Sequence, residues 1–182
     1  MTFKRSEILT LAAIVAIVAA AFLYAFIQSD TASDQNSEAT RVLGGTESPF
    51  TDLQGNPFPL EEHKDKVRVV NAWASWCPFC VNELPDFITL SQEFKDVAVI
   101  AINRKESNVL AQSFVAQFES LGNVVFVQDP EDSFYKSIGG FAMPETVFYD
   151  QEGNVSFHKR GFMTLEEMRS HTQTAISATN TN

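Results

Sequence analysis

Both cysteines of this chain lie in one five-residue segment, Trp-Cys-Pro-Phe-Cys, at positions 76–80. The β-branched and apolar run 67–73 precedes the segment and predicts a buried strand. The residues that follow are apolar at helical spacing, at Val81, Leu84, Phe87 and Ile88. The pattern therefore predicts a strand that delivers a Cys-x-x-Cys motif onto the first turn of a helix.

This placement makes the first cysteine reactive. Unpaired backbone N–H groups and the positive end of the helix dipole stabilise a thiolate there, so we expect Cys77 to be a nucleophile. Cys80 lies one helical turn further and can attack the mixed disulfide that Cys77 forms. The motif thus predicts thiol–disulfide exchange, with the Cys77–Cys80 disulfide as the redox centre and no other cofactor.

Other interpretations of the two cysteines are a zinc site, a structural disulfide and a pair of unreactive buried thiols. A zinc site would need ligands from carboxylates or from His63, His158 and His171, and these histidines lack ligand-like spacing. A structural disulfide across two residues closes too short a loop to stabilise the fold much. Unreactive thiols would leave the intervening proline and the preceding tryptophan unexplained. We therefore expect redox chemistry without a bound metal.

Residues 8–27 form an uncharged stretch of 20 residues, long enough to span a hydrocarbon core of about 30 Å. Lys4 and Arg5 precede it, which predicts a cytoplasmic N-terminus over 1–7 and a single-pass membrane anchor. The rest of the chain is then expected on the extracytoplasmic, periplasmic side. A cleaved signal peptide is the alternative, although its apolar part usually spans only ~7–15 residues.

The chain beyond the apolar stretch divides by composition. Residues 28–41 are almost entirely polar and predict a flexible tether. Residues 42–178 have the length of one domain, and 179–182 are expected to be a disordered tail. The formal net charge of −10 argues against nucleic acid as a partner.

The expected domain alternates strands and helices. The predicted elements are a hairpin over 50–60, strands at 67–73, 96–102 and 124–127, helices at 78–94, 107–122 and 131–137, a hairpin over 145–159, and a last helix from Thr164. Pro85 is expected to kink the helix at 78–94. The helix at 107–122 is expected to bury one stripe, formed by Leu110, Phe114, Phe118 and Leu121. This order predicts an α/β domain, a mixed central sheet flanked by helices on both faces.

The motifs at 70–77 (VNAWASWC), 83–85 (ELP) and 143–146 (MPET) resemble those of a thioredoxin-fold protein. More narrowly, they resemble the membrane-anchored, extracytoplasmic thiol–disulfide oxidoreductases of the TlpA, ResA and CcmG type. The resemblance covers about residues 43–176. It implies a thioredoxin-like domain preceded by an N-terminal transmembrane helix.

The resemblance also implies roles for single residues. Cys77 would be the exposed nucleophile, Cys80 the buried resolving thiol, and Pro144 a cis-proline opposite both. The substrate-binding surface would comprise Trp76, Pro78, Phe79, Met143, Pro144 and Glu145.

Asn71 stands where ordinary thioredoxins carry a buried aspartate that moves protons to and from the resolving thiol. Asparagine cannot titrate, so we expect Glu83, one turn beyond Cys80, to take this role, as in the ResA-type motif. A carboxylate near a forming thiolate raises the thiol pKa by like-charge repulsion. Glu145, which resembles the Pro-Glu-Thr of the CcmG group, is the alternative. Either glutamate could instead be a bystander, and for Glu83 that means a solvated helix residue.

The expected function is therefore that of a reductase of protein disulfides, held on the bilayer outside the cytoplasm. Its expected partners are disulfide-containing proteins, apocytochrome c among them, and a membrane thiol donor that reduces it again. A disulfide-forming oxidant and a tethered, chaperone-like binding module without turnover are the alternatives.

Overall fold

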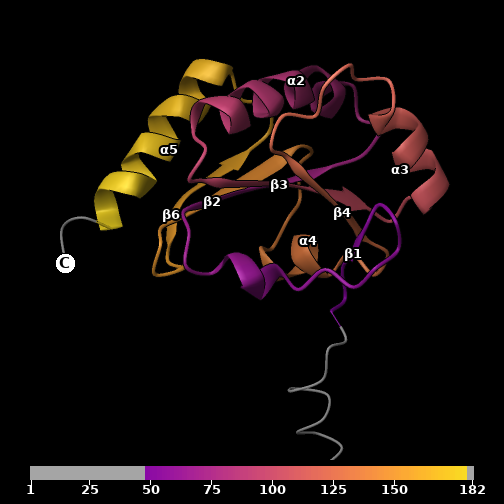
Figure 1. The fold of residues 1–182 in the computed structure, drawn as a ribbon, viewed down its shortest axis with the longest axis horizontal. Helices are drawn as coiled ribbons and strands as arrows, with labels where there is room; N and C mark the ends of the chain where they lie inside the picture. The colour runs from indigo at the N-terminus through magenta and orange to yellow at the C-terminus, as the bar shows by residue number, and fades with distance from the viewer. Residues whose placement is uncertain (1–47, 180–182) are drawn as a thin grey trace, which may run out of the picture. The chain divides into compact units, whose positions relative to one another are not determined.

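The computed structural model describes residues 48–179, which build a six-stranded mixed sheet with helices on both faces (Figure 1). The expected N-terminus at 1–7, the anchor at 8–27, the tether at 28–41 and the end of the tail lie outside the described residues. Within the described range, no helix has the length and hydropathy needed to cross a membrane.

The observed elements follow the expected order with shifted bounds. The strands are β1 (Thr51–Asp52), β2 (Arg68–Trp73), β3 (Ala98–Arg104), β4 (Val125–Asp129), β5 (Glu145–Tyr149) and β6 (Val155–Arg160). The helices are the 3-10 turn η1 (Leu60–His63) and the α-helices α2 (Pro78–Glu93), α3 (Asn108–Val115), α4 (Ser133–Ser137) and α5 (Leu165–Thr179). Helix α2 runs through Pro85.

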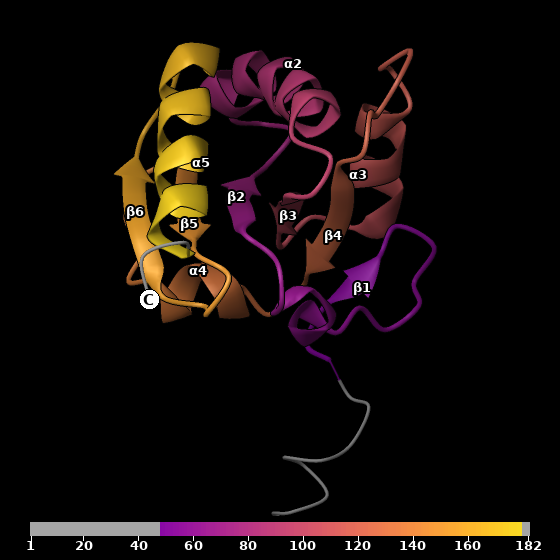
Figure 2. The ribbon, with the colours of Figure 1, turned by 60° about the vertical axis from the view of Figure 1, so that its left-hand side comes forward.

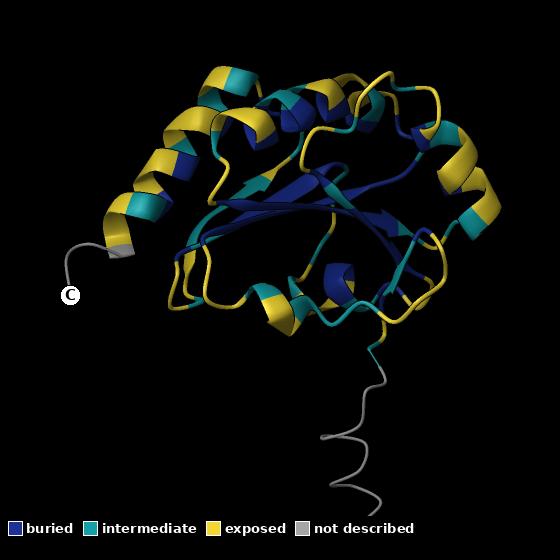
Figure 3. Cartoon of the chain, in the orientation of Figure 1, coloured by how far each residue is buried: buried dark blue, intermediate teal, exposed yellow. Residues whose placement is uncertain are grey.

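The sheet order is β1-β4-β3-β2-β5-β6, with β2 near its middle. Strand β2 is parallel to β3 and antiparallel to β5, and all six of its residues are buried. Figure 3 shows that the central strands are buried inside the domain and that the outward faces of the helices are exposed. The expected mixed sheet is therefore confirmed.

Two apolar clusters cover the two faces of the sheet. Val69 and Trp73 of β2 belong to the cluster under α2, α3 and α5, whereas Val70 and Ala72 belong to the cluster on the α4 side. This alternation follows from the two-residue period of a strand. Figure 2 shows α2 and α5 side by side on one face, and these two helices are in contact. We refer below to the α2 face and the α4 face of the sheet.

The expected hairpin at 50–60 is only partly formed. Its first arm is the two-residue β1, which pairs with β4. Its second arm is reduced to a single bridge between Thr51 and Pro57. Prolines at 57 and 59 explain the reduction, because a proline has no N–H to donate to a ladder. The turn itself forms, with Gly55 at a φ of 87°.

The expected helix at 107–122 is wrong in its length and in part of its buried face. Helix α3 ends at Val115, and the buried positions are Ala111 and Val115. Leu110 is 57% exposed, because one residue along a helix turns the side chain by about 100°. The aromatic and leucine side chains further along the predicted stripe still pack at the edge of the core, at Phe114, Phe118 and Leu121.

Candidate active site

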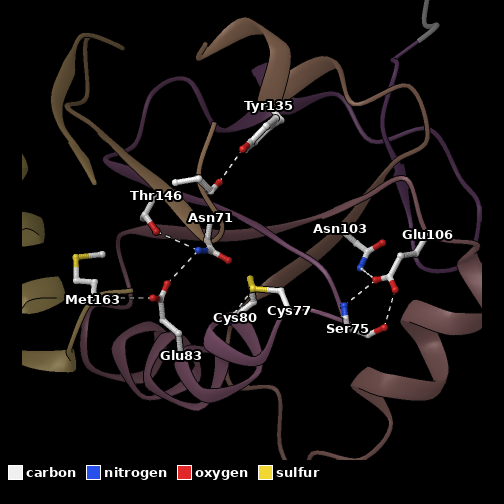
Figure 4. Close-up of a disulfide and its surroundings, with 11 residues drawn as sticks. Asn71, Ser75, Cys77, Cys80, Glu83, Asn103, Glu106, Tyr135, Thr146 and Met163 are labelled. Carbon is white, nitrogen blue, oxygen red and sulfur yellow. Dashed lines mark hydrogen bonds between the residues drawn. A yellow bond between two sulfur atoms is a disulfide. The ribbon is translucent and has the colours of Figure 1, made fainter. Parts of the chain in front are cut away.

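The Cys77–Cys80 disulfide lies at the junction of β2 and α2 (Figure 4). Cys77 is the N-cap residue of α2, and Pro78 takes the first helical position, where the missing N–H of a proline costs nothing. The backbone N–H of Cys80 donates to Cys77 Sγ at 3.2 Å. After reduction, this N–H and the helix dipole are positioned to stabilise a Cys77 thiolate. The predicted strand-to-helix placement of the motif is confirmed.

Both cysteines are buried in the disulfide form, which corrects the expectation of an exposed Cys77. Cys77 is 3% exposed and Cys80 is 1% exposed. The cause is the N-cap geometry, because the Cys77 side chain turns back over the first turn of α2 to accept the N–H of Cys80. The exposed residues of the motif are Trp76, Pro78 and Phe79, and Trp76 and Phe79 are 64% and 62% exposed.

The loop before β5 contains the expected cis-proline, since the Met143–Pro144 peptide bond is cis. Ala72 pairs with Glu145, so the antiparallel register places Pro144 beside the end of β2 that leads to Cys77. Met143 packs against both apolar clusters, and the cluster on the α2 face includes the two cysteines. The structure thus brings the proline loop to the disulfide end of the sheet.

Glu83 is fully buried, so its interpretation as a solvated helix residue is wrong. Its Oε1 accepts a hydrogen bond from Asn71 Nδ2 at 3.1 Å, and its Oε2 accepts one from the Met163 backbone N–H at 2.9 Å (Figure 4). Burial raises the pKa of Glu83 to about 8, although the Met163 hydrogen bond acts in the opposite direction. Glu83 therefore changes its charge around pH 8, one helical turn from Cys80.

Asn71 joins Glu83 to β5. Besides its bond to Glu83, the Asn71 amide donates to Thr146 Oγ1 at 3.0 Å. The contact follows from the sheet register, in which Asn71 pairs with Thr146. Sequence reasoning missed Thr146 and the Met163 N–H. The pairing of the 67–73 strand with the MPET segment could have identified Thr146, whereas no sequence signal marks Met163.

Glu145 is also fully buried, but its partners are of a different kind. The carboxylate meets two backbone N–H groups, an imidazole and a guanidinium, from Phe141 (2.8 Å), Ala142 (2.8 Å), His158 (2.7 Å) and Arg160 (3.9 Å). Adjacent strand residues point to opposite faces, and Thr146 contacts the Asn71–Glu83 pair on the α2 face. Glu145 therefore lies on the α4 face, where it fastens the Pro144 loop to β6.

A second polar cluster beside the disulfide was not anticipated from the sequence. Glu106 accepts the Ser75 backbone N–H at 2.8 Å and the Ser75 hydroxyl at 2.6 Å (Figure 4). Asn103 Nδ2 donates to the same carboxylate at 2.6 Å. Ser75 lies two residues before Cys77, so Glu106 fixes the path of the chain into the motif. The polar residues that follow β2 and β3 were the available signal, because the ends of adjacent parallel strands meet at one edge.

The three histidines considered as zinc ligands lie in three different elements. His63 is in η1, His158 is in β6 beside Glu145, and His171 is in α5, where it stacks on Phe157. Between residues 48 and 179, no cluster of three or more His, Cys, Asp or Glu side chains is arranged to hold a metal ion.

Comparison with known proteins identifies the fold and the chemistry. The Redoxin family model matches residues 35–176. The thiol-disulfide oxidoreductase ResA of Bacillus cereus is 25% identical over 173 residues, which cover 92% of this chain and 96% of ResA. The thiol:disulfide interchange protein HelX of Rhodobacter capsulatus is 31% identical over 148 residues, which cover 76% of this chain and 80% of HelX.

The solved structures agree with this assignment. The structure of MTB dsbF matches with a TM-score of 0.63 at 25% identity, covering 69% of this chain and 92% of dsbF. In this chain, the fold, the cysteine pair at the start of α2 and the cis-proline loop agree with the resemblance noted above. The chain therefore belongs to the Redoxin family and is a thioredoxin-fold thiol–disulfide oxidoreductase of the TlpA, ResA and CcmG type.

Proposed function

We propose that this oxidoreductase is a membrane-tethered reductase of protein disulfides that works outside the cytoplasm. The observation that carries the proposal is the burial of Glu83 near Cys80, which raises the glutamate pKa to about 8. A carboxylate in this position opposes a second negative charge on the cysteines. Strong disulfide oxidants depend on a stabilised reduced form, so a site that disfavours the thiolate suits a reductant.

The reaction divides into two exchanges. The Cys77 thiolate attacks a substrate disulfide, forming a mixed disulfide and releasing one substrate thiolate, which takes up a proton. Cys80 then loses its proton and attacks Cys77 Sγ, which forms the Cys77–Cys80 disulfide and releases the second substrate thiolate. Two electrons pass from the enzyme to the substrate. Because Cys80 is 1% exposed, an internal group is needed to accept its proton, and we assign this role to the ionised form of Glu83, which becomes a carboxylic acid in this step.

The partners follow from the direction of electron flow. A reductase in an oxidising compartment must itself be reduced, which requires a thiol donor in the membrane. The proposed substrates are extracytoplasmic protein disulfides, including those of the haem-attachment cysteines of apocytochrome c. The uncharged stretch 8–27 supports the anchor, and a reporter fused after Asn182 should be active outside the cytoplasm. Release of a shortened protein cut near residues 25–33 would instead indicate a cleaved signal peptide.

The reduction potential of the Cys77–Cys80 pair tests whether the protein reduces or forms disulfides. The full-length protein is equilibrated in defined glutathione or dithiothreitol buffers, and the fraction of Cys77–Cys80 disulfide is measured by thiol alkylation. We expect a potential well below about −200 mV, as for thioredoxin-type reductants. A potential near about −120 mV would instead identify a disulfide-forming oxidant. Insulin reduction by the wild type and by Cys77→Ser provides the activity control, since only the wild type should show turnover.

A further inference from the structure

Arg68, at the start of β2, is buried without an ionic partner. The residue is 8% exposed, and its Nε has no hydrogen-bond partner among residues 48–179. None of the five ion pairs found in this range includes Arg68. A guanidinium withdrawn from water is costly unless an anion or hydrogen-bond acceptors compensate it. Its environment therefore indicates what it could bind.

Arg68 lines a cavity of about 380 Å³ on the α4 face of the sheet. This volume lies within the range of small-molecule sites. Most of the wall is apolar or aromatic, formed by Phe50, Leu60, Val70, Phe134 and Tyr149. The polar remainder is Glu61, Ser133 and Ser137 besides Arg68 itself. The cavity thus combines one cation with an apolar wall.

The position of the guanidinium is defined by the sheet. Arg68 pairs with Tyr149 across β2 and β5, and its guanidinium carbon lies 5.0 Å from the centre of the Tyr149 ring. Burial raises the pKa of the half-buried Tyr149, whereas the neighbouring Arg68 acts in the opposite direction. Arg68 and Trp73 are the two ends of β2, about 17 Å apart along an extended strand. The cavity is therefore separate from the disulfide site.

We propose that this cavity binds a small monocarboxylate with an apolar body. The planar fork of Arg68 matches the two oxygens of a carboxylate, and the apolar wall accommodates the rest of the molecule. Glu61 is exposed and lies in the same lining, so it would repel a second negative charge on the ligand. A phosphate fits less well, because it carries more charge and the wall offers few further donors.

The test compares an acid with its neutral amide. The probes are 4-phenylbutyrate and 4-phenylbutanamide, titrated calorimetrically into the full-length protein in nanodiscs, with empty nanodiscs as the blank. We expect the acid to bind at least about 10-fold more tightly than the amide, as for a hydrogen bond to a charged group. Arg68→Gln should remove this preference, and Glu61→Gln should strengthen binding of the acid about 2- to 5-fold.

The two substitutions are expected to change binding of the acid in opposite directions, which distinguishes a binding site from a structural role. Circular dichroism and insulin reduction should match the wild type in both variants, which controls for folding and for the distant disulfide. Equal binding of acid and amide by the wild type, or no binding of the acid, would overturn the proposal. So would an Arg68→Gln variant that folds and still prefers the acid. None of these outcomes depends on the direction of the redox reaction.

Discussion

Two fully buried glutamates near the end of β2 have opposite surroundings. Glu83, on the α2 face, is held by neutral donors from Asn71 and Met163. Glu145, on the α4 face, meets an imidazole and a guanidinium in addition to two backbone N–H groups. Burial raises the Glu83 pKa to about 8, and neither of its hydrogen-bond donors is a cation. The comparison indicates that a buried carboxylate becomes a proton carrier or a structural clamp according to its partners.

The largest expected effect is on the pH dependence of stability. The folded-state pKa of Glu83, about 8, lies above its ordinary value of 4.5, so the folded protein holds this proton more tightly. The stability that Glu83 contributes is therefore complete below pH 4.5 and is lost as the pH rises through 8. Glu83→Gln should remove this loss, which amounts to up to about 1.4 kcal/mol per pH unit between these values.

Urea unfolding of the oxidised wild type and of Glu83→Gln, from pH 5 to pH 9, measures this difference. The variant should gain stability relative to the wild type as the pH rises. Glu145→Gln is the matched control, being an equally buried glutamate with the same change in chemistry. A stability difference between Glu83→Gln and the wild type that stays constant with pH would contradict the assignment of Glu83 as the titrating group.

The second-largest expected effect is a loss of stability in the loop before β5, which contains Pro144 and is held by Glu145. Glu145→Gln replaces one acceptor oxygen by an N–H₂ group and should destabilise the fold by about 2 kcal/mol, as expected for hydrogen bonds to a charged group. Amide hydrogen exchange at Phe141 and Ala142 should become faster, because both N–H groups donate to one carboxylate oxygen and would have only a neutral amide oxygen as acceptor in the variant. Glu83→Gln should leave these two amides protected. Unchanged exchange in Glu145→Gln would show that the negative charge of Glu145 is not needed to hold the loop.

The smallest expected effect is on the apparent pKa of the cysteine thiols. Glu83→Gln should lower the apparent thiol pKa of the reduced pair by about one unit, or about 1.4 kcal/mol, because it removes a neighbouring negative charge. Alkylation rates of the reduced protein from pH 5 to pH 10 provide the measurement. A shift in Glu145→Gln with none in Glu83→Gln would make the acid beside Pro144 the tuning group. If neither variant shifts the pH dependence of the alkylation rate, both glutamates are bystanders in the thiol chemistry.

The sequence predicted the fold well where local and long-range preferences agree. Five of the seven residues at 67–73 are apolar and buried in the core, and the motif after them contains both a helix N-cap and a first-turn proline. The prediction failed at α3, where leucine and phenylalanine at i, i+4 spacing suggested the buried face. The core instead receives the smaller Ala111 and Val115. Side-chain size alone could not reveal which side of the helix meets the sheet.

The sequence predicted those parts of the candidate site that lie within a single short segment of the chain. The cysteines and the cis-proline follow from two short motifs, and the spacing from Cys80 made Glu83 a candidate. Its burial could not be predicted, because one of its two hydrogen bonds comes from Met163, 80 residues away. The burial of Cys77 was also missed, since the sequence does not show that its sulfur turns back over α2.

The hydrogen bonds between Glu106 and Ser75 limit where residues can be inserted into the chain. Glu106 lies only two residues beyond the end of β3, and it serves both the N–H and the hydroxyl of Ser75. An insertion between β3 and Glu106 would shift the carboxylate away and leave the entry to Cys77 without its acceptor. The exposed residues Glu119 and Ser120, beyond α3, carry no such constraint. Tags, reporters or grafted loops therefore belong after α3, where added length does not reach the cysteines.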